Sequence, residues 1–296
     1  MMKHNQAQWL APQRVVLLGA SGFIGRELKA HLESKNVNVL AFSSKDVDLM
    51  QKSAVQTLKE KIQSTDTVVL LSALTPEKGK DTATLIKNMS MAQNVSEFLE
   101  EKKLAHFVYI SSDAVYADDI NPVSETSYAA PATLYGCMHL AREHAVKASA
   151  QKHKTPTLVL RPCAVYGPHD THNSYGPNRF ARTALKDSKI TLFGNGEEKR
   201  DHVFIDDVVR LITLTLGHVS EGLLNIASGS SPSFMEVAQA VASNSGPQTK
   251  IECNPRSGPI VHRHFDVTET IRAFPTFSFT SISEGLAKTV HALKSR

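Results

Sequence analysis

Three glycines spaced three residues apart form the pattern in this sequence that most directly indicates chemistry. They follow a continuous apolar run at residues 14–18 and open a helical pattern at residues 24–32. Glycine permits a tight turn and a close backbone approach to a pyrophosphate, while a helix N-terminus offers free N–H groups and a positive dipole end. We therefore expect a dinucleotide such as NAD or NADP to bind here. The turn consists of Gly19, Ala20, Ser21, Gly22, Phe23, Ile24 and Gly25.

The composition excludes several other classes of function. The 33 basic and 29 acidic residues give a net charge of +4, which is too small an excess to indicate a nucleic-acid partner. The 13 histidines form no metal-binding pattern, and Cys137, Cys163 and Cys253 are too scattered for a disulfide framework or a zinc site. No apolar run reaches the ~18 residues of a membrane helix, and residues 1–12 lack a signal core. We expect a cytoplasmic protein with no metal and no membrane partner.

The elements that must position the glycine turn alternate between short apolar runs and helical patterns. Apolar strands of four to six residues between amphipathic helices favour a parallel sheet covered on both faces. We therefore predict an α/β fold with a doubly wound parallel sheet of the Rossmann type. The expected strands are residues 14–18, 37–42, 67–71, 106–110 and 157–160, with helices at residues 24–32, 81–102 and 134–151.

The second half of the chain lacks the regular alternation of apolar runs and helical patterns that the first half shows. Prolines and glycines after Arg161 interrupt any regular pattern up to residue 177, which indicates loop. Helices are expected at residues 178–186, 208–216, 233–243 and 282–293, with short strands at 190–193 and 203–205. We predict a cofactor-binding domain at residues 1–165, to which residues 202–228 return. Residues 166–201 and 229–296 form a smaller α/β lobe.

The glycine spacing resembles that of the extended short-chain dehydrogenase/reductase superfamily, which includes epimerases, dehydratases and reductases of nucleotide sugars. Further motifs of that superfamily follow in order along almost the whole chain, and they imply NAD or NADP as cofactor and a nucleotide-sugar substrate. The matching segments are Ser111-Ser112-Asp113-Ala114-Val115-Tyr116, Tyr135-Gly136, Leu160-Arg161-Pro162, Val165-Tyr166-Gly167-Pro168, Phe193-Gly194-Asn195-Gly196, residues 200–208 and Ser283-Glu284-Gly285-Leu286.

The resemblance also implies which residues contact the cofactor. Relatives often carry an acidic residue at the end of the second strand, where it grips the ribose of NAD. Here that strand ends in Ser43, Ser44 and Lys45, and an ammonium with two hydroxyls suits a 2′-phosphate, which favours NADP. The other positions implied to line the cofactor are Asp48, Leu49, Ser72, Ala73, Leu74, Pro162 and Cys163. We expect Cys163 to be a buried small side chain without a nucleophilic role.

In the superfamily a tyrosine exchanges the proton of the substrate alcohol, and a serine or threonine steadies the substrate oxygen. Ser112 and Tyr135 match these positions. A lysine four residues after the tyrosine normally lowers its pKa, but His139 stands there. Histidine is largely neutral at pH 7 and would depress the pKa of Tyr135 less. Either His139 supports an enzyme with a shifted pH optimum, or the chain is a cofactor-binding sensor or regulatory protein.

The substrate side resembles the superfamily only in part. Arg200 and Arg256 match positions that clamp a diphosphate, and Asn178 occupies the place of another substrate contact. Ala164 stands where many relatives have an asparagine that reaches the diphosphate. Asp113 is followed by Ala114 rather than by a second acid, which disfavours 4,6-dehydration. An epimerase or a 4-keto-sugar reductase remains, and the resemblance implies a homodimer through a four-helix bundle.

Overall fold

The apolar runs of the first half form one large sheet in the computed structural model, which describes residues 1–295. Six strands run parallel in the spatial order β3-β2-β4-β5-β6-β10, and the two-residue strand β1 (Lys3–His4) pairs antiparallel with β10 at one edge. The predicted fold class, a doubly wound parallel α/β sheet, is confirmed. The parallel strands are β2 (Val15–Leu18), β3 (Val39–Phe42), β4 (Thr67–Leu70), β5 (His106–Ile110), β6 (Thr157–Pro162) and β10 (Ser220–Ile226).

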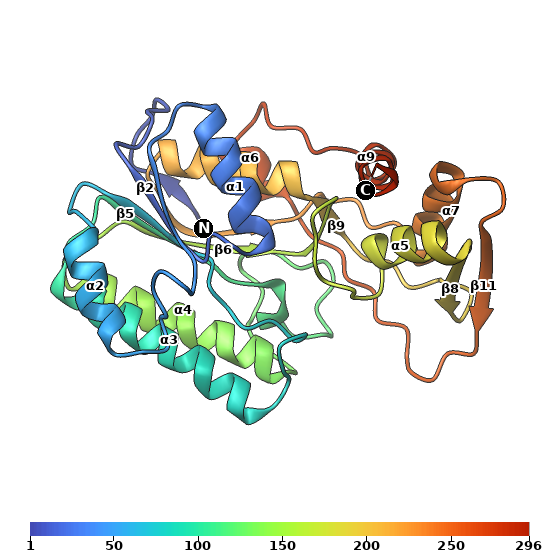
Figure 1. Cartoon of the computed structure of the whole chain (residues 1–296), viewed down its shortest axis with the longest axis horizontal. Helices are drawn as coiled ribbons and strands as arrows, with labels where there is room; N and C mark the ends of the chain where they lie inside the picture. Colours follow the sequence, from blue (N-terminus) through green and yellow to red (C-terminus); the bar gives the residue numbers. More distant parts are fainter. Residues whose placement is uncertain (296) are drawn as a thin grey trace.

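Helices cover both faces of this sheet. In Figure 1, α1 (Phe23–Ser34) and α6 (Ile205–Gly217) lie above it, and α2 (Ser53–Lys61), α3 (Thr82–Glu101) and α4 (Leu134–Gln151) lie below it. The coverage explains why β2, β4 and β5 are buried along their whole length and read as unbroken apolar runs. Among residues 1–295, no helix is long and apolar enough to cross a membrane.

The order of the strands fixes where a ligand can bind. The chain leaves β2 for β3 on one side, then crosses back to β4 on the other side of β2. Connections that depart in opposite directions open a crevice beyond the carboxyl ends of β2 and β4, which is the usual binding place in such sheets. The glycine turn follows β2 directly and therefore lies in this crevice.

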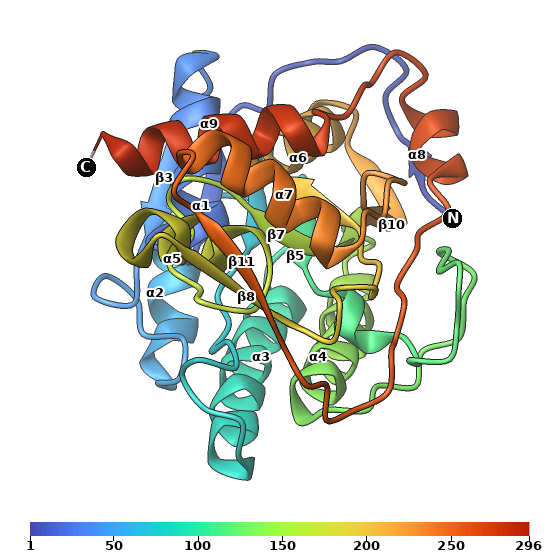
Figure 2. The same cartoon turned by 90° about the vertical axis from the view of Figure 1, so that its right-hand side faces the viewer.

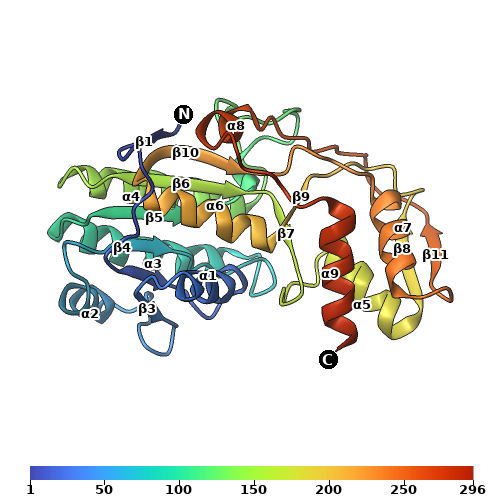
Figure 3. The ribbon, with the colours of Figure 1, turned by 90° about the horizontal axis from the view of Figure 1, so that it is seen from above.

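A smaller group of elements from the second half lies beside the sheet in Figure 3, and it faces the viewer in Figure 2. Strands β8 (Lys189–Phe193) and β11 (Lys250–Asn254) form a parallel pair, and helices α5 (Pro177–Asp187), α7 (Phe234–Ser245) and α9 (Ile282–Lys294) pack against one another. A second parallel pair, β7 (Ala164–Tyr166) and β9 (His202–Phe204), lies where the chain passes between the two groups. A short helix, α8 (Thr268–Ala273), packs near β10.

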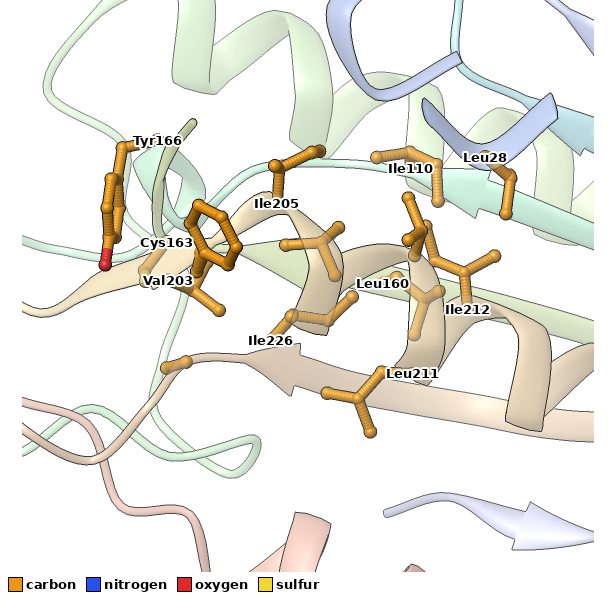
Figure 4. Packing of buried hydrophobic residues seen from close by; sticks show 14 of the residues in the cluster. Leu28, Ile110, Leu160, Cys163, Tyr166, Val203, Ile205, Leu211, Ile212 and Ile226 are labelled. Atoms are coloured by element: carbon orange, nitrogen blue, oxygen red, sulfur yellow. The ribbon is translucent and has the colours of Figure 1, made fainter. Parts of the chain in front are cut away.

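One apolar cluster joins the sheet to the elements beyond it. Ile205, Leu211 and Ile212 of α6 meet Leu160 of β6 and Ile226 of β10 (Figure 4). The same cluster continues into β7, β9, α5, α7 and α9. The sheet and the smaller group therefore share buried surface rather than being connected by a free linker.

The interpretation of residues 162–177 as continuous loop is wrong in part. Strand β6 runs on to Pro162, and β7 follows at Ala164–Tyr166. Proline is tolerated as the last residue of β6, where it opposes Ile226. The three-residue β7 is too short for a period-2 pattern to reveal it.

Candidate functional site

A cleft of about 780 Å³ opens at the carboxyl ends of β2, β4 and β5. It is lined by the glycine turn, the corner after β3, the segment after β4 and the start of α4. Of the residues implied to contact the cofactor, all but Ser43 and Lys45 line it. Those present are Gly19, Ser21, Gly22, Phe23, Ile24, Gly25, Ser44, Asp48, Leu49, Ser72, Ala73, Leu74, Tyr135, His139, Pro162 and Cys163. A larger and more open hollow of about 1020 Å³ lies between α1 and α5, outside this constellation.

The glycine turn needs glycine at two of its three glycine positions. Gly19 has a φ of +103°, and a Cβ there would lie 2.7 Å from the Ser72 nitrogen. A Cβ on Gly25 would lie 2.4 Å from the Gly19 oxygen, whereas one on Gly22 would meet only that oxygen, at 3.4 Å. Helix α1 starts at Phe23 without a side-chain cap, so its first N–H groups remain available to an anion. The turn therefore fits the dinucleotide that the sequence predicts.

The corner after β3 differs from the sequence interpretation. Asp46 folds back, and its carboxylate accepts hydrogen bonds from the Ser43 nitrogen at 2.8 Å and the Ser43 hydroxyl at 2.6 Å. These bonds lower the pKa of Asp46. A carboxylate thus lies at a corner where the sequence indicated only hydroxyls and an ammonium. The Ser43 hydroxyl is already bonded, and the preference for NADP over NAD loses part of its basis.

Tyr135 is brought to Ser112 by tight packing at the start of α4. Thr133 caps the helix through its hydroxyl, which accepts from the Gly136 nitrogen at 3.1 Å. A Cβ on Gly136 would lie 2.0 Å from the Ala114 oxygen, so only glycine lets the helix approach this segment. Burial, followed by the Asp113 carboxylate, raises the pKa of Tyr135 to about 12, while a hydrogen bond with Ser112 and the positive charge of Arg142 act in the opposite direction.

His139 carries no charge that could assist Tyr135. It is 2% exposed, and its ring meets the Tyr135 ring edge-on with 4.6 Å between centroids. Burial, followed by the positive charge of Arg142, lowers the pKa of His139 well below its usual value. The imidazole is therefore neutral at pH 7. Its Nε2 atom is buried and has no hydrogen-bond partner within residues 1–295.

An ion pair beneath the site holds α4 against the sheet. The Glu143 carboxylate accepts from Arg161 at 2.9 and 2.6 Å and from the Ser111 hydroxyl at 2.6 Å. The Arg161 guanidinium lies over the Tyr116 ring, 4.7 Å from its centroid. Burying two charges is costly unless both are paired and bonded, as they are here. This ion pair fixes where α4 lies on the sheet, and therefore where Tyr135 lies at the start of that helix.

Cys163 is buried against an acid. Its Sγ lies 3.6 Å from Asp201 Oδ1, and burial raises its pKa well above the usual value. A thiol that stays protonated is a poor nucleophile, which agrees with the expectation that Cys163 has no covalent role.

The three residues predicted on the substrate side do not line the cleft. Both polar atoms of the Asn178 side chain bond to the backbone of Gly167. Its Oδ1 accepts from the Gly167 nitrogen at 3.1 Å, and its Nδ2 donates to the Gly167 oxygen at 2.6 Å. Glu198 lies between the two arginines, with one oxygen 3.3 Å from Arg200 and the other 3.1 Å from Arg256. Both arginines keep a buried Nε with no partner in the described part of the chain.

Several site residues escaped sequence reasoning. The loop after β7 brings Asp170, Thr171 and His172 to the cleft, and the Asn173 nitrogen donates to Glu77 Oε1 at 2.9 Å from across it. No sequence motif marks this loop. Tyr109 and Arg142 contact His139 or its partner but lie in patterns that read as a strand and a helix. Arg142 lies three residues after His139, so the two side chains lie on the same face of the helix. This spacing was the one signal in the sequence that could have linked them.

Comparison with known proteins identifies the family. The model of the NAD dependent epimerase/dehydratase family matches residues 15–227, so the chain belongs to that family. The dTDP-L-rhamnose 4-epimerase of Burkholderia thailandensis is 35% identical over 147 residues, which cover 48% of this chain and 40% of that protein. Matches to the curated relatives span between 40% and 66% of the length of those proteins.

Solved structures agree with the fold. The UDP-glucose 4-epimerase of Thermus thermophilus, in complex with NAD, has a TM-score of 0.82 and 22% identity, covering 95% of this chain and 99% of that chain. A GDP-L-fucose synthetase of Naegleria fowleri, bound to NADP, has a TM-score of 0.85 and 17% identity, covering 98% and 96%. The predicted cofactor class, NAD or NADP, is confirmed by the family and its structural neighbours. The roles of individual site residues stay predictions.

Proposed function

We propose that this protein reduces a keto group on a nucleotide-linked sugar, with NADH or NADPH as the reductant and Tyr135 as the proton donor. The protonation state of Tyr135 carries the proposal. With a pKa of about 12, on the order of one phenol in 10⁵ is ionised at pH 7. A protonated phenol can donate to a carbonyl oxygen that is gaining negative charge, but it cannot accept a proton from an alcohol.

This state favours reduction over epimerisation. An epimerase of this kind first takes the alcohol proton with its tyrosine while NAD+ takes the hydride from carbon. It then returns the hydride to the opposite face of the ketone while the tyrosine returns the proton to the oxygen. The first step needs a phenolate, and His139 is too deeply buried to supply the cation that would stabilise one. A reductase needs only the second step. The neutral imidazole therefore leaves the resting tyrosine in the form that a reduction uses.

The residues of this chain have defined tasks in such a reduction. The bound coenzyme supplies the hydride. Tyr135 donates its phenolic proton to the carbonyl oxygen and is then reprotonated from solvent. Ser112 donates its hydroxyl proton to the same oxygen in place of Asp113 Oδ1, to which it donates at 3.3 Å in this structure, while its own oxygen accepts from the Ala114 nitrogen at 3.2 Å.

Arg200 and Arg256 are proposed to bind the diphosphate of the substrate. Guanidinium groups suit this because their donors are planar and paired. Glu198 bridges the two side chains and keeps them close together. Asn178 is proposed to fix the Gly167 turn instead, since both of its amide atoms are bonded there. This assigns residues 166–201 and 229–296 to the substrate and residues 1–165 to the cofactor.

The second candidate is a cofactor-binding sensor or regulatory protein without turnover. Two observations favour it. His139 is neutral and buried, and Glu198 already occupies the arginines that would bind the diphosphate. Neither observation prevents the cofactor from binding, so the two candidates differ in turnover and not in affinity for NAD or NADP.

One assay separates the candidates. The purified protein is incubated with NADPH or NADH and with UDP- or dTDP-linked 4-keto-6-deoxyglucose, and loss of absorbance at the reduced nicotinamide band is followed. A reductase consumes coenzyme and sugar in equal amounts, and Tyr135→Phe abolishes the reaction. An epimerase instead interconverts UDP-glucose and UDP-galactose with no net loss of coenzyme. Coenzyme binding without turnover of either substrate set supports the sensor.

We also propose a homodimer through the outer faces of α3 and α4. These helices pack together, and two large apolar side chains on them are exposed, Ile86 at 58% and Leu134 at 40%. An antiparallel pairing of two such faces would form the four-helix bundle that the resemblance implies.

A further inference from the structure

Three buried side chains form a cluster behind Tyr135, which we call the Tyr109 cluster: Tyr109 on β5, and His139 and Arg142 on α4. The Tyr109 hydroxyl lies 2.6 Å from His139 Nδ1. The Arg142 guanidinium lies over the Tyr109 ring, 5.2 Å from its centroid. The exposed fractions of the three side chains are 0%, 2% and 0%. In the sequence, Tyr109 is visible only as one residue of an apolar run that predicts a buried strand.

The hydrogen bond between Tyr109 and His139 has a determined direction. Burial raises the pKa of Tyr109, so the phenol keeps its proton. Among the described residues, His139 Nδ1 is the hydrogen-bond partner of this hydroxyl, and a buried donor without an acceptor is strongly disfavoured. Tyr109 therefore donates and Nδ1 accepts. A neutral imidazole that accepts at Nδ1 carries its own proton on Nε2.

Arg142 keeps the imidazole in this neutral form. Its guanidinium is fixed by the Ser72 oxygen at 2.7 Å and by Asn88 Oδ1 at 3.3 Å. A fixed positive charge at this place opposes a second positive charge on His139. The cation of this site is thus the fully buried Arg142, three residues after the position of the superfamily's lysine, and it does not line the cleft.

The other ring nitrogen of His139, Nε2, is the group whose hydrogen bond these contacts do not account for. It is buried and has no partner within residues 1–295, although His139 lines the cofactor cleft. The Tyr135 ring covers one side of the imidazole and the Tyr109 ring lies stacked near it at 5.9 Å, so the ring has little freedom to turn. A buried N–H group held in this way calls for an acceptor that the chain does not provide.

We propose that Tyr109 is a positioning residue, which holds His139 as a neutral Nε2–H donor toward a ribose hydroxyl of the bound coenzyme. This inference rests on the cofactor site of the proposed function. It gives His139 a hydrogen-bonding role toward the coenzyme in place of the charge that a lysine would bring. The group at position 139 would then bind the coenzyme without activating the tyrosine.

The first test reads the tautomer directly in the coenzyme-free protein. Long-range ¹H–¹⁵N spectra of the imidazole nitrogens are recorded at pH 7.5, and the His139 signals are assigned by their absence in His139→Leu. We expect the Nε2–H tautomer in the wild type and a mixture of tautomers in Tyr109→Phe. Tyr116→Phe is the control, because it removes another buried hydroxyl, bonded to Asn225 at 2.8 Å, and should leave His139 unchanged. An Nδ1–H tautomer in the wild type overturns the proposal.

The second test measures coenzyme affinity in a double-mutant cycle. NADPH and NADH are titrated by the change in nicotinamide fluorescence. Loss of one neutral hydrogen bond should raise the Kd about 3- to 10-fold in Tyr109→Phe and in His139→Leu. Because Tyr109 acts through His139, Tyr109→Phe should change the Kd by less than 1.5-fold when made in His139→Leu. Equal effects of Tyr109→Phe in both backgrounds contradict the positioning role.

The two tests keep this inference separate from the proposed function. If the wild type binds neither coenzyme, the cofactor site and the inference both fail. If it binds coenzyme and reduces the keto sugar, but carries the Nδ1–H tautomer, the inference fails alone. If the tautomer and the double-mutant cycle are as expected and no substrate turns over, the inference holds and the result supports the sensor over the reductase.

Discussion

At the scale of a single residue, His139 differs from the lysine that the resemblance implies because it brings no charge to Tyr135. A lysine at this place would carry its charge on a flexible stem that reaches the cleft, whereas the imidazole is short, buried and neutral. The phenol of Tyr135, whose pKa is raised to about 12 by burial and by the Asp113 carboxylate, stays protonated at pH 7.

Replacing this histidine should change the pH dependence of the reaction. In His139→Lys we expect alcohol oxidation at pH 8 to become at least tenfold faster, because an ammonium favours the Tyr135 phenolate. At the same pH, kcat/KM for ketone reduction should rise by the same factor, because a catalyst does not change the equilibrium constant between the two directions. The variant should also melt about 3–8 °C lower, since a buried charge replaces a bonded imidazole. Initial rates in both directions and thermal unfolding check these outcomes.

The control for that experiment is His144→Lys, which adds the same charge on the exposed side of α4. It should leave both rates and the melting temperature unchanged. A similar gain in His144→Lys, or no gain in His139→Lys, would show that charge at position 139 does not limit oxidation.

Asp46 provides a second prediction at this scale, on the choice of cofactor. Its carboxylate is ionised and lies at the corner after β3, where it would repel a 2′-phosphate. Asp46→Asn should therefore improve NADPH binding about 3- to 10-fold while NADH binding changes less than twofold. Fluorescence titration with both coenzymes measures this, and Lys45→Gln should shift the ratio the opposite way. Equal changes for the two coenzymes would mean that Asp46 does not face the ribose.

The sequence could identify the residues of this site but not their bonding. The change of lysine to histidine at position 139 is visible in the spacing from Tyr135. The partner Tyr109 lies 30 residues earlier and reads only as part of an apolar strand. Asp46 was equally out of reach, because a one-dimensional pattern does not show that a loop folds back onto Ser43.

At the scale of elements, the junction of β2 and α1 combines a packing task with a binding task, and two glycines separate them. A Cβ on Gly25 would press against the Gly19 oxygen at 2.4 Å, so Gly25→Ala should push α1 away and lower the melting temperature by more than 5 °C. A Cβ on Gly22 has ordinary space, and its φ of −70° suits alanine. Gly22→Ala should fold normally and bind coenzyme at least tenfold more weakly.

Thermal unfolding and coenzyme titration of both variants provide the check. Weak binding with normal stability in Gly22→Ala supports a pyrophosphate at this turn. Normal binding in Gly22→Ala would mean that the cofactor lies elsewhere.

The elements that sequence patterns predicted are those with a strong period or a buried apolar run. The helix at residues 134–151 was predicted with its observed bounds. Helix α2 was missed because its nine residues carry little apolar signal, and β11 because its side chains are mostly exposed. Both depend on tertiary contacts: α2 packs on α3, and β11 pairs with β8.

At the scale of the whole molecule, buried histidines couple folding to pH. The pKa of His106 is lowered to about 4 by burial, and that of His202 to about 3. The unfolded chain takes up these protons below about pH 6.5, while the folded chain does not. Stability is therefore fully present above pH 6.5 and is lost as the pH falls toward 4.

His106→Gln should weaken this dependence. It keeps a donor for the Ser220 oxygen, which His106 Nε2 contacts at 2.6 Å, and removes the titrating ring. The free energy of unfolding should then fall less steeply between pH 6 and pH 4.5, by about 1.4 kcal/mol per pH unit for one proton. Urea denaturation across this range measures the slope. The exposed His144→Gln serves as the control, and an unchanged slope in His106→Gln would count against the assignment.

The last prediction, also at the scale of the whole molecule, concerns the proposed dimer. A self-complementary interface repeats each contact twice, so one charge placed at its centre is repeated as well. The wild type at 10 µM should elute as a dimer of about 65 kDa, twice the mass of the 32.4 kDa chain, with light scattering as the measure. Ile86→Glu on α3 should yield a monomer with the same melting behaviour at low concentration. Ile271→Glu on α8 replaces an equally exposed isoleucine, at 57%, and should stay dimeric. A monomeric wild type, or dissociation by Ile271→Glu alone, would place the interface elsewhere or remove it.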